Sequence, residues 1–89
     1  MATVFIPPLM RDLTNGRDRI DVDGANVRQI VTALEALYPG IRARLVDGET
    51  ISPRVAVAID GYVTRLGFLE RVGPTSEVHF LPAISGGNE

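Results

Sequence analysis

The chain closes with Phe80-Leu81-Pro82-Ala83-Ile84-Ser85-Gly86-Gly87-Asn88-Glu89, an apolar strand that runs into two consecutive glycines. Glycine has no Cβ atom, so a diglycine segment is thin enough to enter a channel too narrow for side chains. Glycine pairs near chain ends are also common in frayed termini without a function. The residues by themselves therefore leave two interpretations open, a frayed terminus and a tail that is presented to a partner enzyme.

Upstream of that stretch, the most regular pattern is one of apolar residues at helical spacing. Asn26 lies three residues before Gln29, which is a variant of the capping box that begins helices, and Pro39-Gly40 supplies a stop signal. The pattern predicts a helix of about three turns with one face buried against a sheet. That face holds six residues: Val27, Ile30, Val31, Leu34, Leu37 and Tyr38.

Short runs of β-branched and aromatic residues predict strands on both sides of the helix, at 3–6, 19–22, 54–59, 62–64 and 77–82. Asn15-Gly16 predicts a hairpin that pairs the first two strands antiparallel, and Asp60-Gly61 predicts a second tight turn. This order of elements predicts an α+β domain with a single helix across one face of a sheet.

The connections between these elements carry weaker signals. Residues 41–46 predict a helical turn that directs Ile41 and Leu45 inward, and residues 47–53 predict a polar loop. An irregular link before the last strand contains three apolar residues that we expect to cover the core: Leu66, Phe68 and Leu69.

The composition excludes several classes of function. The 89 residues include no cysteine and one histidine, His79, so neither a disulfide framework nor a Cys- or His-ligated metal site is expected. All nine basic residues are arginine and eleven acidic residues leave a net charge of −2, which disfavours nucleic acid as a partner. No apolar stretch is long enough to span a membrane and no secretory signal is evident, so we expect a cytoplasmic protein without a cofactor.

A catalytic role would need a nucleophile beside a base, and Ser85 and His79 are the candidates. A histidine on a strand and a serine in a tail several residues away are not expected to form a preorganised pair. Asp21 and Asp23 could suggest a paired-carboxylate site, but acids just before a helix are more simply explained by the helix dipole. We therefore expect no enzymatic activity.

Four segments together resemble the ThiS/MoaD-type sulfur carriers, which are ubiquitin-like proteins that end in Gly-Gly. They are Ile6–Leu9 with Leu13–Gly16, Leu34–Ile41, Val57–Gly61 and Glu77–Gly87, and their pattern is most similar to the carriers of cysteine and siderophore (thioquinolobactin-type) biosynthesis. The resemblance implies a β-grasp fold, a mixed sheet of four to five strands in which the last strand lies parallel to the first at the centre. It also implies a domain over residues 1–82 and a flexible tail over 83–89.

What the resemblance implies for function concerns the tail. An E1-like enzyme of the ThiF/MoeB type, which uses ATP, would adenylate the Gly87 carboxylate, and sulfur would then form a thiocarboxylate for an acceptor such as a cysteine synthase. Ile84, Ser85 and Gly86 would be gripped by that enzyme. Because Asn88 and Glu89 follow the diglycine, a JAMM-type metalloprotease would first cut between Gly87 and Asn88.

The sequence by itself does not decide which residues dock a partner or which kind of partner this is. Phe5, Phe68, Phe80 and Leu81 could form an apolar docking patch, or all four could fill the core. The same tail would also suit the small subunit of a molybdopterin synthase, a ubiquitin-like modifier of target lysines, or an interaction module with an inert tail.

Overall fold

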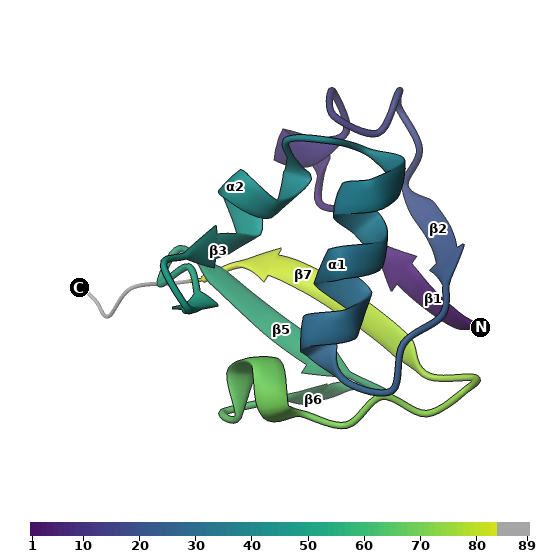
Figure 1. The fold of residues 1–89 in the computed structure, drawn as a ribbon, viewed down its shortest axis with the longest axis vertical. Coiled ribbons are helices and arrows are strands. Elements are labelled where there is room, and N and C mark those ends of the chain that lie inside the picture. Colours follow the sequence, from purple (N-terminus) through teal and green to yellow (C-terminus); the bar gives the residue numbers. More distant parts are fainter. Residues whose placement is uncertain (84–89) are drawn as a thin grey trace.

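The computed structural model describes residues 1–83, and five strands form its main sheet in the order β2-β1-β7-β5-β6. These are β1 (Ala2–Phe5), β2 (Arg19–Val22), β5 (Val55–Ile59), β6 (Tyr62–Val63) and β7 (Glu77–Pro82). The last strand, β7, is central: it runs parallel to β1 on one side and antiparallel to β5 on the other (Figure 1). The predicted β-grasp arrangement is confirmed, including the bounds of the closing strand.

The first connection differs from the prediction of a tight hairpin. β1 and β2 do pair antiparallel, with Phe5 opposite Arg19. However, a longer connection joins them and contains the 3-10 helix η1 (Pro8–Met10), and Asn15-Gly16 make a turn only near its end, with φ angles of 55° and 83°. The reason is Pro7-Pro8, which lack backbone N–H groups and so cannot continue the ladder of β1.

The helix α1 (Val27–Leu37) begins and ends as its sequence predicts. The side chain of Asn26 accepts a hydrogen bond from the Gln29 N–H at 2.9 Å, and the Gln29 side chain accepts one from the Ala25 N–H at 2.7 Å. Leu37 was expected in the core but is 56% exposed. Leu37 lies about 80° around the helix from Val27, at the margin of the buried stripe, and it is the last residue of the helix. The next residue, Tyr38, is partly buried against the core at this end of the helix.

The segment after α1 contains one element that was not expected. The predicted helical turn is α2 (Ile41–Leu45), and both of its terminal residues are fully buried. The predicted polar loop contains a small hairpin, β3 (Val46–Asp47) with β4 (Thr50–Ile51), whose turn includes Gly48 at φ 67°. Partial burial of Val46 and Ile51 against the core provides the free energy that holds such short strands together.

Of the three apolar residues that were expected to cover the core in the link before β7, only Phe68 is buried, while Val72 in the same link is buried as well. The link forms the 3-10 helix η2 (Gly67–Leu69), in which Phe68 is buried and Leu69 is 75% exposed, and Leu66, just before the helix, is 59% exposed. With about three residues per turn, so short a helix can direct only one of these side chains inward. The Val27 N–H donates to the Glu70 carbonyl at 3.0 Å, which ties the link to the start of α1.

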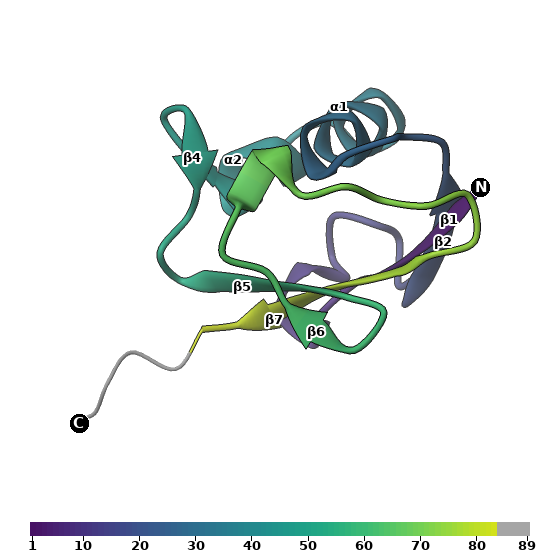
Figure 2. The ribbon, with the colours of Figure 1, turned by 90° about the horizontal axis from the view of Figure 1, so that it is seen from below.

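The core lies between the sheet and the helices, which share one side of the sheet (Figure 2). From the helical side it receives the buried stripe of α1, and from the sheet it receives alternate residues: Ala2, Val4, Ile20, Val22, Val57, Val78 and Phe80. The opposite sheet face carries the other residues of each strand. The division of the chain at residue 82 into domain and tail stays a prediction.

Candidate functional site

The candidate site is the end of β7, from which the diglycine segment continues. Val78 and Phe80 point into the core and are at most 1% exposed, so they anchor the strand. The Ala83 N–H donates to the Arg54 carbonyl at 2.9 Å, which extends the pairing with the β5 side one residue past the strand. The sheet therefore holds the chain up to residue 83, while five predicted site residues lie outside the described residues: Ile84, Ser85, Gly86, Gly87 and Asn88.

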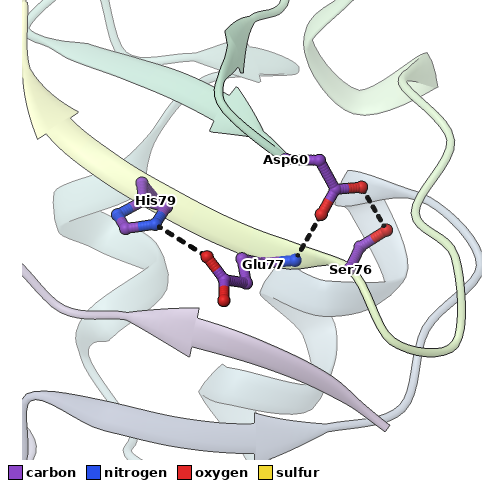
Figure 3. Close-up of polar contacts among 4 residues, drawn as sticks. All are labelled: Asp60, Ser76, Glu77 and His79. Carbon is purple, nitrogen blue, oxygen red and sulfur yellow. Dashed lines mark hydrogen bonds and ion pairs between the residues drawn. The ribbon is translucent and has the colours of Figure 1, made fainter.

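The other end of β7 is fixed by Asp60, in the turn between β5 and β6. Its carboxylate accepts the Glu77 N–H and the Ser76 hydroxyl, each at 2.9 Å (Figure 3). Ser76 is 7% exposed, and its oxygen also accepts the Gly73 N–H at 2.8 Å. Asp60 itself has φ 51°, a left-handed conformation that Asp and Asn tolerate better than most residues. The Asp60 side chain thus holds the first residue of β7 against the turn between β5 and β6.

His79 takes part in a packed contact on the open face of the sheet. Its ring stacks on Phe5, with 4.1 Å between the ring centroids and 3° between the planes, and its Nε2 lies 3.8 Å from Glu77 Oε1 (Figure 3). The candidate nucleophile Ser85 lies beyond the described residues. Among residues 1–83, no group of three His, Asp or Glu side chains lies close enough together to hold a metal ion.

The four apolar residues considered for docking divide into two pairs. Phe80 and Phe68 are 1% and 8% exposed, so they belong to the core and cannot form a docking patch. Phe68 is also covered by the Arg28 guanidinium, 5.3 Å from its ring centroid. Leu81 is 41% exposed and Phe5 is half-buried beneath the His79 ring, so only these two reach the surface near the tail.

Two hollows flank the end of β7 and share three lining residues, Pro7 from the segment after β1 and Leu81 and Pro82 from β7. The hollow next to α2, of about 600 Å³, is also lined by Arg44, Asp47 and Arg54. The hollow next to β1, of about 450 Å³, is lined by three further charged residues: Arg11, Asp18 and Arg19. Leu81 and Pro82 therefore form a ridge between two partly charged depressions.

Sequence reasoning missed the arginines of these hollows. Arg19 and Arg54 are 35 positions apart, and nothing in the local sequence links them to the tail. The register of the sheet places both arginines near the tail. Arg19 is opposite Phe5, which neighbours His79 on β7, and the Arg54 carbonyl accepts a hydrogen bond from the Ala83 N–H. Pairing of the segment 54–59 with the closing strand was the one signal that could have indicated Arg54.

Comparison with known proteins agrees with this geometry. The chain matches the ThiS family over residues 5–87. It is 29% identical over 90 residues to the sulfur carrier protein CysO of Mycobacterium tuberculosis, covering 96% of this chain and 97% of the relative. The same values hold for CysO of Mycobacterium bovis. Among residues 1–83, no helix is both long and apolar enough to cross a membrane.

Solved structures share the fold over nearly the whole chain. A chain of the Amycolatopsis orientalis BexX/CysO complex superimposes with a TM-score of 0.91 at 31% identity, covering 98% of this chain and all of that one. Mycobacterium tuberculosis CysO gives 0.88 at 27% identity, with 94% and 100% coverage. SAMP1 of Haloferax volcanii gives 0.71 at 26%, with 97% and 98% coverage. The chain therefore belongs to the ThiS family, whose ThiS/MoaD-type sulfur carriers related to CysO are co-substrates of partner enzymes and not enzymes themselves.

Proposed function

We propose that this chain carries sulfur as a thiocarboxylate on Gly87 after Asn88 and Glu89 have been removed. The free Gly87 carboxylate would attack the α-phosphate of ATP and form an acyl-adenylate, with release of pyrophosphate. A donor that supplies sulfur at the oxidation level of sulfide would then displace AMP and leave a thiocarboxylate. A carboxylate needs this activation because its oxygen is a poor leaving group, whereas the thiocarboxylate is a nucleophilic form of sulfur.

The observation that carries the proposal is the agreement between the strand and the family match. β7 is held at the centre of the sheet up to Ala83, and the match to the ThiS family extends to Gly87, leaving two residues beyond it. In the sequence given, the Gly87 carbonyl is an amide, which cannot be adenylated as a carboxylate can. Both facts support removal of Asn88-Glu89 before activation.

Three partners follow from this chemistry. An E1-like enzyme of the ThiF/MoeB type would activate Gly87, and a JAMM-type metalloprotease would hydrolyse the bond between Gly87 and Asn88. The likeness to CysO supports a role in cysteine biosynthesis, with a cysteine synthase as the enzyme that accepts the sulfur. Ile84, Ser85 and Gly86 would occupy the channel of the activating enzyme.

The test compares three chains: the full-length protein, a chain that ends at Gly87, and a control that ends at Gly86. Each is incubated with the ThiF/MoeB-type enzyme of the source organism, ATP and sulfide, and intact masses are measured. We expect the mass gain of oxygen-to-sulfur replacement only on the chain that ends at Gly87. A thiocarboxylate on the full-length chain with Asn88-Glu89 still attached would refute trimming, and no modification of any chain would refute the carrier function.

A second candidate function, that of a protein modifier, is favoured by the likeness to SAMP1 of Haloferax volcanii at 26% identity, SAMP1 being a small archaeal modifier protein. The activated Gly87 would then be transferred to lysines of other proteins. The chain has no lysine of its own, so it could not form chains through its side chains. Conjugates of higher mass in cell extract, dependent on ATP and on Gly87, would support the modifier function.

A further inference from the structure

The length of chain beyond the sheet limits where an enzyme that acts on Gly87 can stand. Gly87 is four positions after Ala83, and an extended chain spans at most about 3.6 Å per residue, so the two residues can be at most about 14 Å apart. A catalytic centre within that distance must be surrounded by enzyme surface that also covers the point where the chain leaves the sheet. The ridge of Leu81 and Pro82, with its two hollows, is that point.

The ridge and its surroundings have the composition of a protein interface. Leu81, 41% exposed, is the apolar centre, and the Phe5–His79 stack extends it on one side. Arginine and aromatic residues are enriched in interfaces, which combine an apolar centre with a polar rim. The rim here contains an arginine in each hollow, Arg54 on the α2 side and Arg19 on the β1 side.

The charges of the rim favour one kind of partner surface. Each hollow is lined by two arginines and one aspartate, although the chain as a whole carries a net charge of −2. Asp12 pairs with Arg44 at 3.7 Å, which leaves Arg54 as the principal cation of its hollow. Within residues 1–83 neither Arg19 nor Arg54 forms an ion pair, so both guanidinium groups are available to carboxylates of another protein.

Resting on the function proposed above, we propose that the enzyme that activates Gly87 seats an apolar surface on Leu81 and places carboxylates against Arg19 and Arg54, one in each hollow. The two arginines straddle the end of β7, so this arrangement fixes the direction in which the tail leaves as well as its position. Charge pairs at the rim would act mainly on the rate of encounter and on partner choice.

The test measures activation of chains that end at Gly87 by the ThiF/MoeB-type enzyme of the source organism, with ATP and sulfide. Arg19→Glu and Arg54→Glu are compared with Arg71→Glu, which makes the same change of charge at an exposed residue that lines neither hollow. We expect each of the first two to raise KM about threefold to tenfold, with kcat unchanged. The increase should shrink at high salt, because the ion pairs are exposed.

Leucine variants test the apolar centre separately. Leu81→Ser is compared with Leu69→Ser, since Leu69 is also exposed but lines neither of the two hollows. We expect Leu81→Ser to raise KM about tenfold, as for the truncation of a central interface residue, and Leu69→Ser to leave it unchanged. Circular dichroism and urea unfolding check that each variant is folded.

Failure of the carrier function and failure of the docking surface give different results in these assays. If the unmodified chain ending at Gly87 is not activated at all, the carrier function is refuted, and the docking surface with it. If that chain is activated but Arg19→Glu and Arg54→Glu behave like Arg71→Glu, the carrier function stands and the paired-arginine surface is refuted.

Discussion

Replacement of Asp60 should reveal how much one turn contributes to the strand that carries the tail. Asp60→Ala removes the acceptor of two hydrogen bonds, from the Glu77 N–H and the Ser76 hydroxyl. Each is worth about 1 kcal/mol at a partly solvated site, because water can replace part of what is lost. Alanine also adopts the left-handed region, φ 51° here, at a further cost of about 1 kcal/mol. We expect the free energy of unfolding to fall by about 2–4 kcal/mol.

Two further substitutions separate these contributions. Asp60→Gly removes the same hydrogen bonds but has no penalty for the left-handed conformation, so it should lose about 1 kcal/mol less than Asp60→Ala. Asp60→Asn keeps one acceptor oxygen and also tolerates the left-handed region, so it should lose no more than about 1 kcal/mol.

Urea unfolding followed by circular dichroism measures these differences, since a domain of this size has a slope of about 1 kcal/mol per molar urea. Each kilocalorie then shifts the unfolding midpoint by about 1 M. Equal midpoints for the glycine variant and the unmodified protein would show that the carboxylate contacts contribute nothing, because glycine removes them without a backbone penalty. A glycine variant less stable than the alanine variant would show that the backbone reasoning is wrong.

Two more substitutions test the helix and its end. Leu34→Ala should lower the free energy of unfolding by about 2–5 kcal/mol because Leu34 is fully buried, while Leu37→Ala, at a residue 56% exposed, should change it little; similar urea midpoints for the two variants would contradict the core described here. Glu35 accepts hydrogen bonds from the backbone N–H groups of Arg42 at 2.9 Å and Gly40 at 3.1 Å, and these bonds hold the pKa of its carboxyl below its usual value of 4.5. Its ionised form therefore stabilises the fold fully above pH 4.5, and that contribution is lost as the pH falls through the lowered value. Glu35→Gln should thus be less stable than the unmodified protein at pH 7, with a difference that shrinks at pH 3; an equal difference at both pH values would contradict this assignment.

Short-range chemistry in the sequence was enough to determine most of the elements. The cap at Asn26 and Gln29 marks the start of α1, and Asp60-Gly61 marks the turn between β5 and β6, because these residue types satisfy or permit the local backbone. The diglycine pattern likewise indicated the family, which the match over residues 5–87 confirmed.

Only the tertiary structure decided which apolar residues near the tail are accessible. Phe80 and Leu81 are adjacent and both apolar, and the strand pattern does not say which of them the helices cover; packing of α1 and α2 on one side of the sheet buries Phe80 and leaves Leu81 exposed. The placement of Arg19 and Arg54 in the two hollows that Leu81 lines also depends on the fold, because strand pairing places residues from distant parts of the sequence beside the same strand. Such a placement carries no local signal, since its cause is the register of β7 between β1 and β5.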